Sequence, residues 1–176
     1  MTQPSFRPWF GQVGTFHSEF LVRADVATVR RFHGSTRVLR QLTPPVLGMQ
    51  LHAMGAMEEG MVARFTLWFG PLPVRWTARH EQVSETGFVD VQQEGPMAEW
   101  RHTHRFEAVD AAQTRVIDHI EYAHPPLPRA LLTYALFNGA GLRALFAYRA
   151  LVTQRACARM AAEPPPESAP PVRDAA

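Results

Sequence analysis

The sequence predicts an α+β fold in which a curved antiparallel sheet of about six or seven strands surrounds a long C-terminal helix. Three features of the sequence support this prediction. Residues 15–23 alternate between apolar and polar side chains, which is the pattern of a half-buried strand. Several further strand-like segments follow residue 46 and are joined by very short turns. Residues 129–162 form one long helical run, the only element large enough to cover the apolar face of such a sheet.

Two short helices are expected directly after the first strand. Asp25 is placed to cap a helix that runs through His33, and Ser35 is placed to cap a second helix that runs through Leu42. Pro44 then follows, and proline disfavours the helical conformation in the residue before it. The helical segment therefore ends near residue 43.

The middle of the chain reads as a meander of strands. Turns of two or three residues separate the segments, and strands joined so tightly pair antiparallel. The expected strands that follow the first are residues 61–69, 73–83, 86–94, 98–109 and 114–124.

The two ends of the chain differ from its body. Residues 1–12 are expected to form an extended arm with exposed aromatic side chains at Phe6, Trp9 and Phe10. Residues 163–176 are rich in proline and lack large apolar side chains, which predicts a disordered tail. Residues 13–162 are left as a single ligand-binding domain.

Composition excludes several classes of protein. All 18 basic residues are arginines, but they are scattered and balanced by 16 acidic residues, so we expect no nucleic-acid partner. The single cysteine excludes an internal disulfide and a cysteine zinc site. Arg143 and Arg149 in the most apolar stretch argue against a transmembrane segment, although a transient membrane contact stays compatible with the sequence. The N-terminus lacks the pattern of a signal peptide, so a cytoplasmic location is expected.

Alternation along the strands predicts which side chains face the helix. Arginine and glutamate residues mark the outer faces of 73–83 and 98–109, so the opposite faces point inward. The inner wall is then expected to carry seven aromatic or polar side chains, namely Trp76, His80, Trp100, His102, His104, Asp118 and Tyr122.

Two hairpins decide which of these side chains are neighbours. A three-residue loop at 111–113 would set His102 opposite Tyr122 and Phe106 opposite Asp118. At Gly95-Pro96, a two-residue turn would pair Asp90 with Arg101 on the outside, whereas a longer turn would place Asp90 inside beside His102. We favour the inside position.

Several short motifs resemble a bacterial branch of the START-like superfamily, often called SRPBCC, over residues 13–155. The matching residues are Leu42-Thr43-Pro44-Pro45, Phe88-x-Asp90-x-Gln92, Gly95-Pro96, Trp100-x-His102-x-His104-x-Phe106, Thr114, Asp118, Tyr122 and Pro125. The resemblance implies a helix-grip fold with a ligand cavity between the sheet and the C-terminal helix. It also implies a lipid, polyketide, sterol or quinone as ligand, or an aromatase/cyclase activity, and it transfers no catalytic residue.

The predicted function is therefore the binding or carriage of an apolar small molecule without a cofactor. Pockets of this kind are mostly apolar with a few placed polar groups. The side chains expected to line the cavity are Phe65, Leu67, Trp76, His80, Trp100, His102, Tyr122, Leu142 and Phe146.

Three other functions stay open at this point. His102, His104, Asp118 and Tyr122 supply the groups that a cyclase or dehydratase needs for acid–base catalysis. The aromatic arm would suit a protein-interaction module. His102 and His104, joined by His80 and Asp118, offer imidazole and carboxylate ligands for zinc or iron, although we expect no bound metal.

Overall fold

The computed structural model describes residues 14–53 and 55–163 and has the predicted α+β architecture. The predicted arm (1–12) and all of the predicted tail except Glu163 lie outside the described residues. The elements in chain order are β1 (Gly14–Val22), α1 (Val26–Phe32), α2 (Val38–Gln41), β2 (Gly48–Ala53), β3 (Val62–Phe69), β4 (Leu72–Ser84), β5 (Gly87–Glu94), β6 (Glu99–Asp110), β7 (Gln113–Ala123), α3 (Arg129–Leu136) and α4 (Gly139–Ala162).

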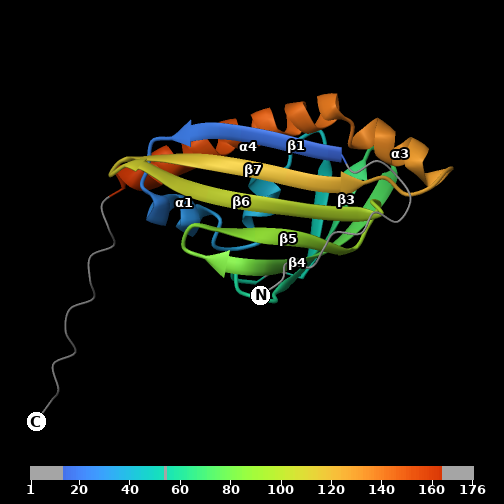
Figure 1. Ribbon diagram of the computed structural model, residues 1–176, viewed down its shortest axis with the longest axis horizontal. Coiled ribbons are helices and arrows are strands. Elements are labelled where there is room, and N and C mark those ends of the chain that lie inside the picture. The colour runs from blue at the N-terminus through green and yellow to red at the C-terminus, as the bar shows by residue number, and fades with distance from the viewer. Residues whose placement is uncertain (1–13, 54, 164–176) are drawn as a thin grey trace, which may run out of the picture.

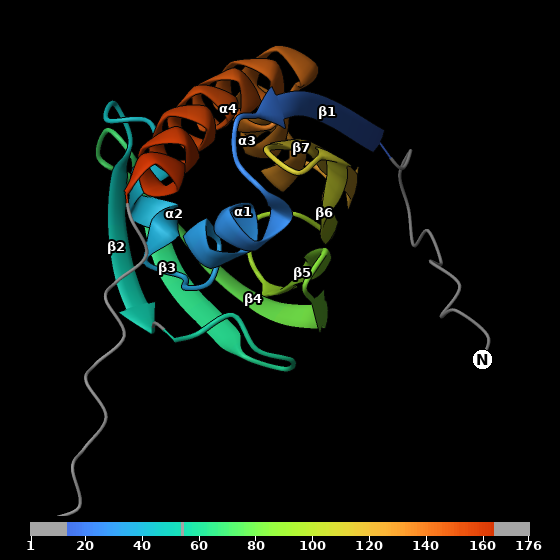
Figure 2. The ribbon, with the colours of Figure 1, turned by 90° about the vertical axis from the view of Figure 1, so that its left-hand side faces the viewer.

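The strands form one antiparallel sheet of seven strands in the order β1-β7-β6-β5-β4-β3-β2. Figure 1 shows the long strands β7, β6 and β5 side by side, with α4 running along the sheet. In Figure 2 the sheet curves from β1 round to β2, and α4 lies across the open side of the curve. The predicted fold class, a helix gripped by a curved sheet, is confirmed.

Two clusters of buried apolar side chains fill the space between α4 and the sheet. One cluster lies where α1 and the C-terminal half of α4 meet the sheet, and it includes Phe106 and Cys157. The other surrounds Leu142 and Phe146 near the start of α4, together with Trp76 of β4. The same helix therefore anchors both halves of the core.

The C-terminal helical run is two helices, which corrects the prediction of one continuous helix from 129 to 162. α3 and α4 meet at a bend of 43°. The side chain of Asn138 accepts hydrogen bonds from the backbone N–H groups of Ala140 and Gly141 and so caps a new helix. Gly139 and Gly141 follow this cap, and glycine has low helix propensity. In α3, Leu131 is 67% exposed, so this side chain does not pack against the sheet.

The two short helices begin differently from each other. Asp25 caps α1 as predicted, since its Oδ1 accepts a hydrogen bond from the N–H of Thr28 at 2.7 Å. The predicted cap at Ser35 is wrong. α2 is only four residues long, and its N-cap residue is Arg37, which makes no side-chain capping hydrogen bond.

Within the described residues, no single helix combines the length and apolar composition of a membrane span. The pair α3 and α4 reaches that length and composition only when the two are taken together across their bend.

The register between β6 and β7 differs by two residues from the prediction. His104 lies opposite Asp118, and Trp100 rather than His102 lies opposite Tyr122. The turn consists of two residues, since Asp110 pairs with Gln113, and an irregularity between Ala108 and Asp110 absorbs the remaining offset. A shift of two residues keeps every side chain on its face, so the predicted inner and outer faces hold while the predicted partners do not.

The register between β5 and β6 follows the favoured prediction, with Asp90 opposite His102. The connection is longer than a two-residue turn, because β5 ends at Glu94 and β6 begins at Glu99. The Gln92 side chain holds this connection: its amide nitrogen donates to the carbonyl oxygen of Met97 at 2.9 Å.

Candidate functional site

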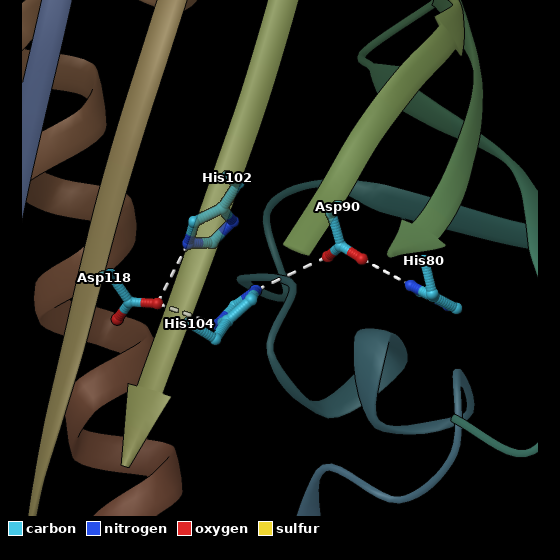
Figure 3. A network of polar contacts seen from close by, with 5 residues as sticks. All are labelled: His80, Asp90, His102, His104 and Asp118. Atoms are coloured by element: carbon cyan, nitrogen blue, oxygen red, sulfur yellow. Dashed lines mark hydrogen bonds and ion pairs between the residues drawn. The ribbon is translucent and has the colours of Figure 1, made fainter. Parts of the chain in front are cut away.

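Five polar side chains form a chain of contacts across four adjacent strands on the concave face of the sheet (Figure 3). They are His80 on β4, Asp90 on β5, His102 and His104 on β6, and Asp118 on β7, and we call them the His–Asp network.

His104 is the centre of the His–Asp network, because both of its ring nitrogens face a carboxylate. Nδ1 lies 2.9 Å from Oδ1 of Asp118, and Nε2 lies 3.4 Å from Oδ2 of Asp90. Burial disfavours the charged ring, but these contacts outweigh it and raise the pKa of His104 to about 9. The ring also stacks on Phe88 with centroids 4.2 Å apart. His104 is therefore an imidazolium that bridges two strands.

The two carboxylates are ionised. Burial alone would raise the pKa of Asp118, but hydrogen bonds from His102 and His104 hold that pKa well below its usual range. Burial opposes ionisation of Asp90 in the same way, and the contacts with His104 and His80 hold its pKa well below the usual range. Two ionised carboxylates therefore flank the imidazolium of His104.

The remaining buried histidines near the network are neutral. Burial, followed by repulsion from His104, lowers the pKa of His102 to about 4. Its Nε2 donates a hydrogen bond to Oδ1 of Asp118 at 2.9 Å. Burial and His104 likewise lower the pKa of His33 to about 4, and the Nδ1 of His33 donates to the carbonyl oxygen of Val29.

His80 has one satisfied and one unsatisfied nitrogen. Nδ1 lies 2.5 Å from Oδ1 of Asp90 and donates to it, because an ionised carboxylate can only accept. The other ring nitrogen is Nε2. It is buried, His80 being only 3% exposed, and it has no hydrogen-bond partner among the described residues. Buried polar atoms without partners are uncommon in folded proteins, so this nitrogen marks a place for a ligand atom or water.

A glycine on β5, Gly87, allows this strand and therefore Asp90 to lie close to β6. Gly87 has a φ of +153°, and a Cβ atom there would collide with the carbonyl oxygen of His104. Only glycine allows the two strands to approach at this point. The pairing of Phe88 with His104, which puts Asp90 next to the ring, depends on that approach.

A small cavity lies against the His–Asp network, and we call it the inner cavity. Its volume is about 80 Å³, enough for a few water molecules or a polar head group. The lining residues are His33, Thr36, Val38, Leu39, Leu42, Met57, Ala63, Phe65, Trp76, Ala78, His80, Phe88, Asp90, His102, His104 and Arg149.

A larger and more open hollow, the outer groove, adjoins it between α4 and the segment that leads into β2. Its volume is about 430 Å³, and its surface is mostly apolar. The lining residues are Thr43, Pro44, Val46, Leu47, Leu67, Phe69, Ala135, Leu136, Phe137, Gly141, Leu142, Ala144, Leu145, Tyr148 and Arg149.

Arg149 lines both hollows and so stands at their boundary. Its Nε donates to the carbonyl oxygen of Leu42 at 3.3 Å, and its guanidinium lies 5.1 Å from the centre of the Phe146 ring. Burial lowers the pKa of Arg149, while Asp118 and Asp90 oppose that shift. Within residues 14–53 and 55–163 it forms no ion pair, which leaves its terminal nitrogens free to donate to a ligand.

Comparison with solved structures identifies the fold. An aromatase/cyclase, Zhui, from a Streptomyces species matches with a TM-score of 0.66 at 14% identity, covering 84% of this chain and 95% of that chain. Norcoclaurine synthase from Thalictrum flavum matches with a TM-score of 0.63 at 13% identity, covering 87% and 99%. A Thermus thermophilus protein matches with a TM-score of 0.60 at 17% identity, covering 84% and 99%. The chain has the START-like fold.

The sequence comparisons add no closer relationship. No protein-family model matches the chain. No curated protein matches it either. The START-like assignment therefore rests on architecture.

The residues that the sequence predicted to line one cavity lie in three different places in the structure. Phe65, Trp76, His80 and His102 line the inner cavity. Leu67 and Leu142 line the outer groove. Trp100, Tyr122 and Phe146 line neither hollow and pack in the apolar cluster around the start of α4.

The candidate acid–base residues are also divided. His102, His104 and Asp118 lie together in the His–Asp network. Tyr122 lies at the other end of β7, where its ring packs against Trp100 and would collide with any side chain at Gly14. It has no hydrogen bond to the network in the described part of the chain.

Sequence reasoning missed two residues of the site, His33 and Arg149. His33 was assigned only to the end of a helix. Arg149 interrupts the apolar face of the C-terminal helix, and an arginine at such a position was the available signal. Asp90 was expected inside, but its contacts with His80 and His104 depend on a register that the sequence left open.

Asp90, His102 and His104 could in principle hold a metal ion, since one ligand atom from each lies within 4.8 Å of the others. Their present hydrogen bonds favour protons instead. Both nitrogens of His104 face carboxylates, so a cation would have to displace a proton from an imidazolium whose pKa is about 9.

Proposed function

We propose that this chain binds an apolar small molecule, with the body of the ligand in the outer groove and one end in the inner cavity. The observation that carries this proposal is the shared wall at Arg149, which joins an apolar groove of about 430 Å³ to a cavity of about 80 Å³ that residues of the His–Asp network help to line. Neither a purely structural network nor a surface interaction site needs such an arrangement.

The volumes support a ligand that occupies both hollows. Pockets for small molecules typically measure about 300–1,000 Å³, so the inner cavity alone is too small and the outer groove is within the range. Leu67 and Leu142 present apolar surface to the groove, and the His–Asp network presents polar atoms to the cavity. A norcoclaurine synthase of the same fold has been solved with dopamine and hydroxybenzaldehyde.

A neutral apolar probe, N-phenyl-1-naphthylamine, tests the proposal by fluorescence titration. We expect saturable binding in the micromolar range by the purified chain. Ala144 lines the groove, so Ala144→Phe should fill it and weaken binding at least tenfold. Ala147 is an exposed alanine on the same helix that lines neither hollow, and Ala147→Phe is the matched control. Equal binding by the two variants, or no binding by the wild type, would contradict the proposal.

An acid–base enzyme is the second candidate function, favoured by the unpartnered Nε2 of His80. A histidine whose other nitrogen donates to a carboxylate has the arrangement of a general base. The groups would be His80 and Asp90 rather than the predicted set with Tyr122. Turnover of a polyketide mimic that is lost in His80→Gln, with probe binding retained, would establish this function over simple carriage.

A further inference from the structure

The ligand's polar end must match the hydrogen-bonding groups of the inner cavity, and these groups are unequal. His80 Nε2 has no hydrogen-bond partner among the described residues, while the other ring nitrogen donates to Asp90. Arg149 can only donate. A group that satisfies both has one oxygen that accepts from Arg149 and, on the same carbon, a second oxygen that can share a proton with Nε2 of His80.

Charge narrows the choice further. Two ionised carboxylates flank the imidazolium of His104, and Arg149 adds a further positive charge to the same cavity wall without an ion pair among the described residues. Buried charges are costly unless paired. A group whose oxygens can accept from the guanidinium of Arg149 therefore suits this position.

We propose that the inner cavity is a carboxyl-recognition site and that the ligand is an apolar carboxylic acid. The proposal rests on the proposed binding function and names its ligand class. The acid's O–H donates to Nε2 of His80, and its carbonyl oxygen accepts from the guanidinium of Arg149. Whichever atom holds the shared proton, the two contacts remain. The alkyl or aryl body of the acid extends past Arg149 into the outer groove.

The size of the inner cavity agrees with this assignment. A volume of about 80 Å³ holds a carboxyl group and little more, since one water molecule occupies about 30 Å³ in the liquid. Apolar side chains, among them Leu42 and Met57, complete the wall. A hydrogen bond that forms among apolar neighbours, and that involves a charged donor, discriminates strongly between a ligand that makes it and one that cannot.

The test compares dodecanoic acid with its methyl ester as competitors of bound N-phenyl-1-naphthylamine. The titration is run at about pH 5.5, near enough to the ordinary pKa of a carboxyl group that part of the acid carries its proton. The ester has the same chain and carbonyl but no O–H. We expect the acid to displace the probe at a concentration at least tenfold below that of the ester.

Variants identify the residues responsible. Arg149→Met keeps the apolar part of the side chain and should reduce the preference for the acid to less than threefold. Arg143→Met, at an exposed arginine on the same helix, should leave the preference intact. Melting curves verify that both variants fold. If Arg149→Met does not fold, the comparison of the acid with its methyl ester on the wild-type protein still tests the proposal.

The outcomes separate the two proposals. Probe binding without any preference for the acid in the wild type would overturn the carboxyl-recognition site and leave the binding function standing. A preference that survives in Arg149→Met would also overturn it. A wild-type chain that binds neither the probe nor either competitor would overturn the binding function itself.

Discussion

The bridging imidazolium of His104 makes a direct prediction about stability and pH. Its pKa is raised from 6.5 to about 9 in the folded protein, and its side chain is only 10% exposed. A difference of this size corresponds to about 3 kcal/mol of folding free energy, at about 1.4 kcal/mol for each pH unit. Because the pKa is raised, this stabilisation is complete below pH 6.5 and is lost as the pH rises toward about 9.

The window between pH 6.5 and 8.5 isolates this effect. His33 and His102, whose pKa values are lowered to about 4, stay neutral throughout it. Both carboxylates of the His–Asp network stay ionised. Of these groups only His104 changes its protonation in the folded protein, and its contribution to the free energy of unfolding should fall by about 2 kcal/mol across the window.

Urea denaturation followed by tryptophan fluorescence at several pH values measures this slope. His104→Gln cannot titrate and should show a free energy of unfolding that is nearly flat across the window. His17→Gln, at an exposed histidine on β1, should keep the wild-type slope. A wild-type protein that is equally stable at pH 6.5 and 8.5 would mean that His104 is neutral, and the account of the network would be wrong.

Three further predictions follow from the structure. Asn138→Ala removes the cap of α4 and should lower the free energy of unfolding by about 1 kcal/mol, measured by urea denaturation against Ala140→Ser as a control. Burial raises the pKa of the Cys157 thiol to about 12, so Ellman's reagent at pH 8 should react with it only after unfolding. Treatment with EDTA should leave the melting temperature unchanged, because hydrogen bonds rather than a metal ion hold Asp90, His102 and His104 in place. Stoichiometric zinc or iron in the purified protein would refute this prediction.

The fold was largely predictable because alternation along strands is a strong signal. Arg101 and Arg105 fix the outer face of β6, and the other face must then point at the helix. The site was less predictable because it depends on register. The pairing of His104 with Asp118 depends on a two-residue turn and an irregular position near Val109, and neither changes the face pattern.

The break in the C-terminal helix shows a similar limit. Gly139 and Gly141 were visible in the sequence, but their effect depends on whether Asn138 turns its side chain onto the free N–H groups that follow. That choice separates α3 from α4 and shapes the wall of the outer groove, where Leu136 and Gly141 both lie. Local propensity is a weak guide where tertiary packing decides between one helix and two.

The His–Asp network also stabilises one register between β6 and β7 over its alternatives. Apolar patterning rejects a one-residue slip between β6 and β7, since such a slip turns the core outward, but it cannot reject a two-residue slip. The two-residue slip removes Asp118 from His104 and leaves a buried carboxylate without its cation, which is strongly unfavourable. Opposite charges on neighbouring strands thus stabilise the observed pairing of β6 with β7, which apolar contacts alone do not distinguish from a two-residue slip. A chain with apolar residues at all five positions of the network would be expected to sample both pairings.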